Sequence, residues 1–121
     1  MTMSIDYETL EILRTLPGSA GGDLLTEVVG IFLAMTPAKI QALKGAVARG
    51  DLEAVANDAH YVKGGAGNMG ILKLAEISHH LELAARQGES QNLVKLMDDL
   101  FLEYTVIEPL LAELIEIEKA S

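Results

Sequence analysis

Apolar residues recur every three or four positions through almost the whole of this sequence, and no segment shows the two-residue alternation of a β-strand. This spacing indicates helices packed on helices. The three tyrosines and two phenylalanines are few, so the core must come mainly from Leu, Ile, Val, Ala and Met. A length of 121 residues fits one domain, so residues 1–121 are expected to form a single unit with a core from about 5 to 118.

Helix-breaking residues interrupt the apolar repeat and mark the expected helix ends. They lie at Pro17-Gly18, at Gly50, at the stretch from Asn68 to Gly70, and at Gly88. Between these breaks we expect five helices: a short one capped by Ser4 or Asp6, one starting near Asp23, one capped by Asp51, one over about 71–87, and a last one opening near Ser90.

Two prolines leave the course of the long helices open. Thr36-Pro37 marks either a break between two helices or a kink within one, and it follows an apolar repeat made of Leu24, Val28, Ile31, Phe32 and Met35. Pro109 lacks a backbone donor and should kink the last helix near Thr105. Because the connections are short, neighbouring helices should run antiparallel. We predict an all-α fold, an antiparallel four-helix bundle with a short extra N-terminal helix laid across it.

Charge and composition exclude several classes of protein. A net charge of −9 argues against a nucleic-acid partner, which requires clustered Lys and Arg. There are no cysteines, which removes disulfides and thiolate chemistry. The longest apolar run covers eight residues, 28–35, whereas a membrane-spanning helix needs about twenty. The acidic N-terminus does not resemble a signal peptide. We therefore expect a cytoplasmic protein that binds neither nucleic acid nor membrane.

The segment after Asp58 carries the residues with the strongest chemical pattern. On a helix, His60, Lys63, Gly64 and Gly67 lie in one line beside the core-facing stripe. Each glycine inside a helix costs roughly 1 kcal/mol relative to alanine, so Gly64, Gly65 and Gly67 together would cost about 3 kcal/mol. A bare surface beside a histidine, approached closely by another protein, explains that cost. The alternative is that the helix ends at Gly64 and that the glycines belong to a loop.

The motif Ala59-His60-x-x-Lys63-Gly64, followed by Gly70, resembles the signature of the histidine-containing phosphotransfer (HPt) domain. The preceding helix pair, from Phe32-Leu33 through Thr36-Pro37 to residues 50–53, resembles the same family, and the likeness covers about residues 5–115. It implies a phosphorelay intermediate that accepts a phosphoryl group on His60 from a receiver aspartate or a histidine kinase. The group then passes to a response-regulator receiver domain.

A narrower resemblance is to the phosphotransfer domain of chemotaxis histidine kinases, which has a lysine, a second histidine and a glutamate at the spacing of Lys63, His79 and Glu82. It implies that Glu82 accepts a hydrogen bond from the imidazole, that the phosphoryl group goes to Nε2, and that His79 supports the site. Lys63 would offset charge on the phosphoryl oxygens. Gly64 and Gly67 would form the docking surface.

The expected partners are response-regulator receiver domains and a sensor histidine kinase. The chain would be a monomeric carrier, not an enzyme, with no nucleotide site, metal or cofactor of its own; Mg²⁺ would belong to the receiver. Two alternatives remain. One is a helical adaptor that is never phosphorylated. The other is a metal-binding bundle, for which Glu76-x-x-His79 supplies half of a di-iron pattern.

Overall fold

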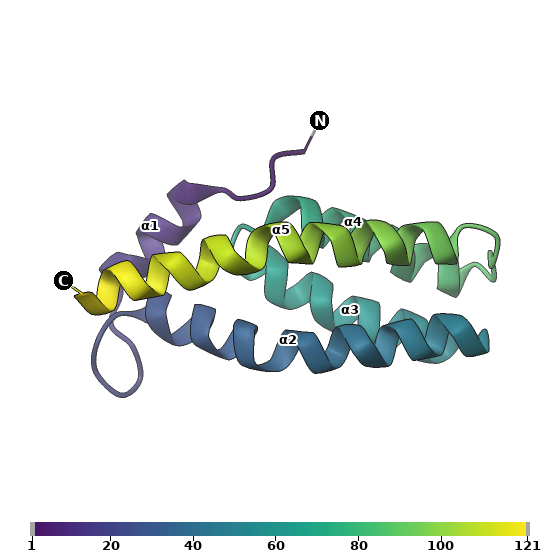
Figure 1. Cartoon of the computed structure of the whole chain (residues 1–121), viewed down its shortest axis with the longest axis horizontal. Coiled ribbons are helices and arrows are strands. Elements are labelled where there is room, and N and C mark those ends of the chain that lie inside the picture. Colours follow the sequence, from purple (N-terminus) through teal and green to yellow (C-terminus); the bar gives the residue numbers. More distant parts are fainter. Residues whose placement is uncertain (1, 121) are drawn as a thin grey trace.

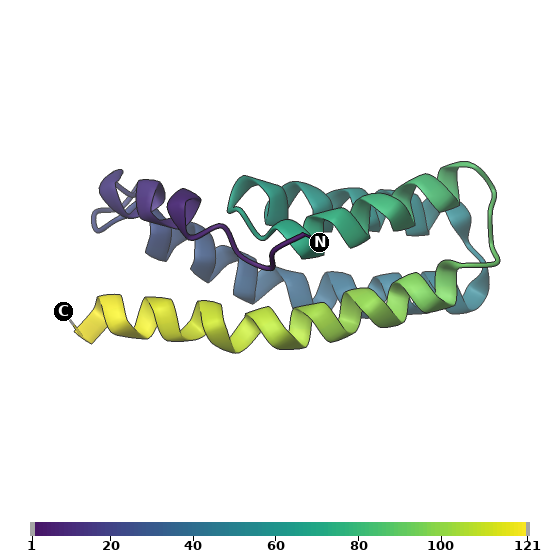
Figure 2. The same ribbon diagram turned by 90° about the horizontal axis from the view of Figure 1, so that it is seen from above.

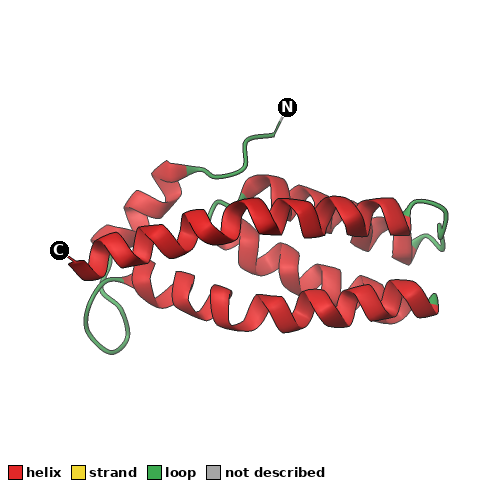
Figure 3. Cartoon of the chain, viewed as in Figure 1, coloured by secondary structure: helices red, strands yellow, loops and turns green. Residues whose placement is uncertain are grey.

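The computed structural model describes residues 2–120, and the side chains of residues 2–116. It contains five helices and, in the described residues, no strand (Figure 3). The helices are α1 (Tyr7–Thr15), α2 (Leu24–Arg49), α3 (Leu52–Asn68), α4 (Leu72–Arg86) and α5 (Leu93–Ala120). The predicted all-α fold is confirmed.

Helices α2 to α5 form the bundle, and each runs antiparallel to the next along the chain (Figure 1). The contacts between helices close a ring, in which α3 packs on α2 and α4, and α5 packs on α2 and α4. The N-terminal part of α2 and the C-terminal part of α5 extend beyond the α3–α4 pair, and α1 packs on α2 at that end (Figure 2). The predicted four-helix bundle with an extra N-terminal helix is therefore correct.

Helix ends lie close to the positions that the capping residues predict. An aspartate side chain accepts a backbone N–H in the first turn of each of the first three helices; these caps are Asp6, Asp23 and Asp51. Gly50 ends α2 in the left-handed conformation, with φ 69°. The prediction for the last helix was wrong by three residues, because the backbone of Ser90 accepts a bond from Leu93 N–H in a turn that precedes α5.

Neither internal proline interrupts its helix. Pro37 lies inside α2, which continues to Arg49, so the two-helix interpretation of Thr36-Pro37 is wrong. Phe32 and Ile40 on either side of it are both buried in the core. Burial of the flanking residues compensates for the one backbone hydrogen bond that proline removes. Pro109 likewise lies within α5.

By length and composition, α2 is also the one described helix that could cross a membrane. A core helix of a bundle meets the same test, and the inward face of α2 packs in the core through Leu25, Val29 and Leu43. The apolar character of α2 is therefore weak evidence for a membrane. The apolar composition of α2 also leaves exposed apolar side chains on its outer side, among them Ile31 and Met35.

The N-terminal segment holds the turn between α3 and α4. Asp6 N–H donates to the carbonyl of Gly70 at 2.7 Å, and Leu72 N–H donates to the carbonyl of Ser4 at 3.0 Å. Gly70 has φ 75°, and a Cβ added there would lie 2.9 Å from Cβ of Thr9, so glycine is required on both counts. This turn fixes how α3 meets α4, the two helices on which the candidate site is built.

Candidate functional site

His60 lies on α3 with its side chain 62% exposed, and its ring reaches the neighbouring helix α4. Nδ1 is 3.0 Å from Oε2 of Glu82. An ionised carboxylate can only accept a hydrogen bond, so in the neutral ring Nδ1 carries the proton and Nε2 holds the lone pair. The geometry thus presents an exposed imidazole with one nitrogen anchored and the other available as a nucleophile.

Glu82 is the centre of the cluster, with only 7% of its side chain exposed. Lys63 Nζ lies 2.7 Å from Oε1, while Arg86 donates to Oε2 from Nη2 at 2.8 Å and from Nε at 3.0 Å. Burial by itself would raise the pKa of Glu82, but the contacts with Lys63 and Arg86, together with His60, lower it from 4.5 to about 2. Glu82 is therefore ionised at neutral pH and remains a hydrogen-bond acceptor for His60.

The structure brings together three of the residues singled out in the sequence, namely His60, Lys63 and Glu82. It adds Arg86, which the sequence reasoning missed. Arg86 lies four residues after Glu82 on the same helix, a spacing at which a glutamate and a following cation stabilise one another. That spacing could have pointed to Arg86, but only once Glu82 was placed at the site.

The glycines of α3 lie inside the helix. The helix continues to Asn68, so the alternative in which it ends at Gly64 is wrong. A Cβ built at Gly64 or Gly67 meets nothing within 4 Å, and neither residue has a positive φ. Neither local crowding nor an unusual backbone conformation requires glycine here. Together, Gly64 and Gly67 leave a bare surface beside His60.

His79 and His80 are both exposed on α4, and their ring centroids are 6.3 Å apart. Within the described side chains, the ionic and hydrogen-bonding contacts of Glu82 are with His60, Lys63 and Arg86, and His79 is not among them. No described contact between His79 and Glu82 therefore supports the role that the resemblance implies for His79. The described residues also contain no group of three His, Asp or Glu side chains placed to hold a metal ion.

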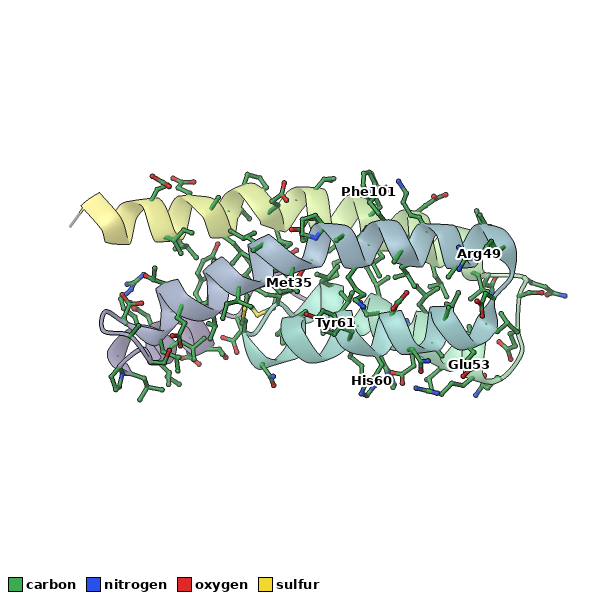
Figure 4. The ribbon with its side chains drawn as sticks, turned by 90° about the horizontal axis from the view of Figure 1, so that it is seen from below. Met35, Arg49, Glu53, His60, Tyr61 and Phe101 are labelled. Carbon is green, nitrogen blue, oxygen red and sulfur yellow. The ribbon has the colours of Figure 1, made fainter. Side chains whose placement is uncertain are left out.

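An apolar groove between α2 and α3 lies beside this cluster. It has a volume of about 470 Å³. Eleven residues line it: Leu13, Val28, Ile31, Phe32, Met35, Thr36, Tyr61, Val62, Gly65, Asn68 and Met69. Figure 4 shows Met35 and Tyr61 over the junction of the two helices, with His60 at the outer edge of α3. His60 and Tyr61 are consecutive on α3, so the groove opens on the face of α3 next to the one that carries His60, about 100° around the helix.

Ile31 and Met35 belong to the apolar repeat of the second helix, yet their side chains are 58% and 53% exposed. They lie at the mouth of the groove and not in the core. Lys39 borders the groove, with Nζ 4.7 Å from the centroid of the Tyr61 ring and 3.4 Å from Oδ1 of Asp58. An exposed apolar groove with a charged border is typical of a surface that another protein covers.

An all-helical bundle that displays an exposed histidine, anchored by a buried carboxylate, has the arrangement that a phosphotransfer module needs. A family model described as the Hpt domain matches residues 27–119, and the chain belongs to this family. It is a histidine phosphotransfer carrier of the phosphorelay type. Members of the family carry phosphoryl groups and are not enzymes with nucleotide sites.

Among solved structures, the fold is similar to that of histidine-containing phosphotransfer protein B (HptB) from Pseudomonas aeruginosa PAO1. The two chains share 25% sequence identity with a TM-score of 0.86, and the match covers 96% of this chain and 97% of that one. No curated protein matched the sequence.

Proposed function

We propose that the phosphoryl group is carried on Nε2 of His60, and that the chain exchanges it with an aspartate of a receiver domain. The observation that supports this most strongly is the 3.0 Å contact between Nδ1 of His60 and Oε2 of Glu82. This contact orients the ring and assigns the lone pair to the exposed nitrogen. The direction of transfer, to or from the receiver, follows from which partner is phosphorylated first.

The chemistry needs no proton transfer. The Nε2 lone pair forms a bond to phosphorus as the bond between phosphorus and the aspartyl oxygen breaks, and the aspartate leaves as a carboxylate. The Nδ1 proton stays in place, so the phosphorylated ring becomes cationic, and Glu82 faces that charge. Stabilising charge that develops in the transition state is the main contribution a protein makes to phosphoryl transfer. Mg²⁺ would come with the receiver domain.

The receiver would dock over α3 and the groove. Gly64 lies one turn beyond His60, between the directions in which His60 and Tyr61 project from the helix. The absence of a side chain at Gly64 therefore leaves the surface open from the imidazole to the groove, and Gly67 leaves the other side of the imidazole bare. A receiver domain could then place apolar residues against Met35 and Tyr61 while its aspartyl phosphate reaches Nε2. We also propose that a sensor histidine kinase is a partner of this chain. The chain would act as a monomer in the cytoplasm.

The test is phosphate exchange with receiver domains from the same cell. A phosphorylated receiver should lose its label to the wild-type chain and should keep it in the presence of His60→Gln. The double variant His79→Gln/His80→Gln is the control, and it should accept label like the wild type. Transfer to His60→Gln at the normal rate would refute the proposal.

The groove also favours a second function, that of an adaptor that binds a partner without phosphorylation. The two functions differ in one result. An adaptor would bind its partner equally well with His60→Gln and would take up no acid-labile phosphate from any receiver.

A further inference from the structure

Besides the imidazole of His60, two cationic side chains contact Glu82. Lys63 approaches from α3 and meets Oε1, whereas Arg86 belongs to the same helix as Glu82 and meets Oε2. Orienting an imidazole requires one ionised acceptor and no cation. Two cations on one buried carboxylate therefore call for a reason beyond the orientation of His60.

The two cations are held differently. Arg86 is the more exposed, at 51% against 30% for Lys63, yet it makes two aligned hydrogen bonds to Oε2. Lys63 meets the other oxygen, Oε1, through a single ammonium group at 2.7 Å. Arg86 also lies in the last turn of α4, where the helix dipole favours a positive charge. Arg86 is therefore held by the two hydrogen bonds of a planar fork, whereas Lys63 makes one contact from the end of a flexible stem.

Phosphorylation changes the charges around His60. A phosphoryl group on Nε2 adds negative oxygens beside Lys63, which lies three residues from His60 on the same face of α3. If Lys63 moved to those oxygens and no arginine were present, the buried carboxylate would face only the phosphorylated ring, whose positive charge lasts only as long as the phosphoryl group stays on it. With Arg86 in place, Glu82 keeps a counter-ion when Lys63 leaves.

Resting on the proposed role of His60, we propose that Arg86 is a positioning residue, the permanent counter-ion of Glu82 whose presence allows Lys63 to move from Oε1 to the phosphoryl group. Arg86 acts through Glu82 and Lys63, and it does not itself touch the phosphoryl group. The proposal makes the effect of Arg86 depend on Lys63. If Arg86 and Lys63 contributed to transfer independently, the effect of substituting Arg86 would be the same with and without Lys63.

The experiment uses the full chain and phosphoramidate as a small phosphoryl donor, so that no partner surface is involved. Five proteins are compared with the wild type: Arg86→Gln, Arg86→Lys, Lys63→Ala, the double variant Lys63→Ala/Arg86→Gln, and Lys95→Gln. The last is a matched control, because Lys95 and Asp99 form an exposed ion pair four residues apart on α5. The measurements are the rate of phosphorylation and the ³¹P chemical shift of the phosphohistidine, which reports whether an ammonium group contacts the phosphoryl oxygens.

We expect Arg86→Gln and Lys63→Ala each to slow phosphorylation about tenfold, because each variant removes the contact of Lys63 with the phosphoryl group, one hydrogen bond to a charged group. The double variant should be no slower than the slower single variant, and both singles should show the same displaced ³¹P shift. Arg86→Lys should keep at least half of the rate and the wild-type shift, and Lys95→Gln should match the wild type throughout.

A wild-type rate or shift in Arg86→Gln, or multiplied effects in the double variant, would overturn the inference while leaving His60 as the carrier. If Arg86→Gln fails to fold, a folded Arg86→Lys that loses the wild-type shift has the same meaning. A wild-type chain that takes up no phosphate on His60 would instead overturn the proposed function itself.

Discussion

His60 and Glu82 lie on adjacent antiparallel helices, 22 residues apart in sequence, with Nδ1 of the imidazole 3.0 Å from Oε2 of the carboxylate. The imidazole is largely in solvent and the carboxylate is almost fully buried. This contrast lets the ring meet another protein while its orientation is set from inside the bundle. The two residues therefore carry different parts of the proposed chemistry, and substitutions should separate them.

Glu82→Ala should slow phosphoryl transfer about ten- to a hundredfold without abolishing it, because a hydrogen bond to a charged group contributes about 1.5–3 kcal/mol. The nucleophile remains, but the ring is free to rotate and to change tautomer. Glu82→Gln keeps an acceptor oxygen without the charge, so its transfer rate should lie between those of the wild type and Glu82→Ala. Single-turnover transfer from a phosphorylated receiver measures this series, and unchanged rates in Glu82→Ala would remove Glu82 from the site.

The ion pairs of Glu82 also predict how stability depends on pH. Because the folded-state pKa is about 2, below the ordinary 4.5, the contribution of Glu82 is fully present above about pH 4.5 and is lost as the pH falls toward 2. Denaturant unfolding of the wild type and of Glu82→Gln should therefore differ by up to about 3 kcal/mol at pH 6, and the difference should shrink toward pH 2. The exposed Glu113 supplies the control substitution, Glu113→Gln. A pH-independent difference for Glu82→Gln would contradict the account.

Gly64→Leu and Gly67→Leu should block transfer from a receiver while keeping the fold. The built Cβ atoms meet nothing, so leucine should maintain or raise stability by up to about 1 kcal/mol each, since it forms helices better than glycine. The new leucine would stand beside His60, between the imidazole and the groove at position 64 and on the other side of the imidazole at position 67. Gly30→Leu is the control, because Gly30 is also helical and open but does not line the groove. Normal transfer in both variants would show that this surface is not where the receiver docks.

Met35→Asp should weaken docking without changing the reactivity of His60. The side chain is exposed at the mouth of the groove, so the fold should tolerate a charge there, whereas an apolar partner surface should not. We expect at least a tenfold weaker affinity for the receiver and an unchanged rate of phosphorylation by phosphoramidate. Val106→Asp places the same charge at an exposed apolar position on α5 and should change neither quantity. Equal affinity in Met35→Asp and the wild type would exclude the groove from the interface.

Much of the fold could be predicted from the sequence because its boundaries are local. Asp6, Asp23 and Asp51 cap their helices within a single turn, and Gly50 ends α2 through its own backbone. The course of α2 through Pro37 could not be predicted, because it depends on the packing of Phe32 and Ile40 against other helices.

The candidate site shows the same limit. The line from His60 through Lys63 to Gly67 follows from helix geometry, but the place of Glu82 beside it came from the family resemblance. Arg86 and the groove depend on how α3 packs against α4 and α2. The apolar repeat of α2 is wider than the stripe that the core buries, so the repeat alone does not distinguish the exposed Ile31 and Met35 from buried residues.

The most direct test of the central claim is to locate the phosphoryl group on the protein after transfer from a phosphorylated receiver. Mass spectrometry under neutral conditions, which preserve phosphohistidine, would be applied to the wild type and to His60→Gln. We expect a single acid-labile phosphoryl group on His60 in the wild type and none in the variant. Label on His79 or His80 that persists in His60→Gln would contradict the account.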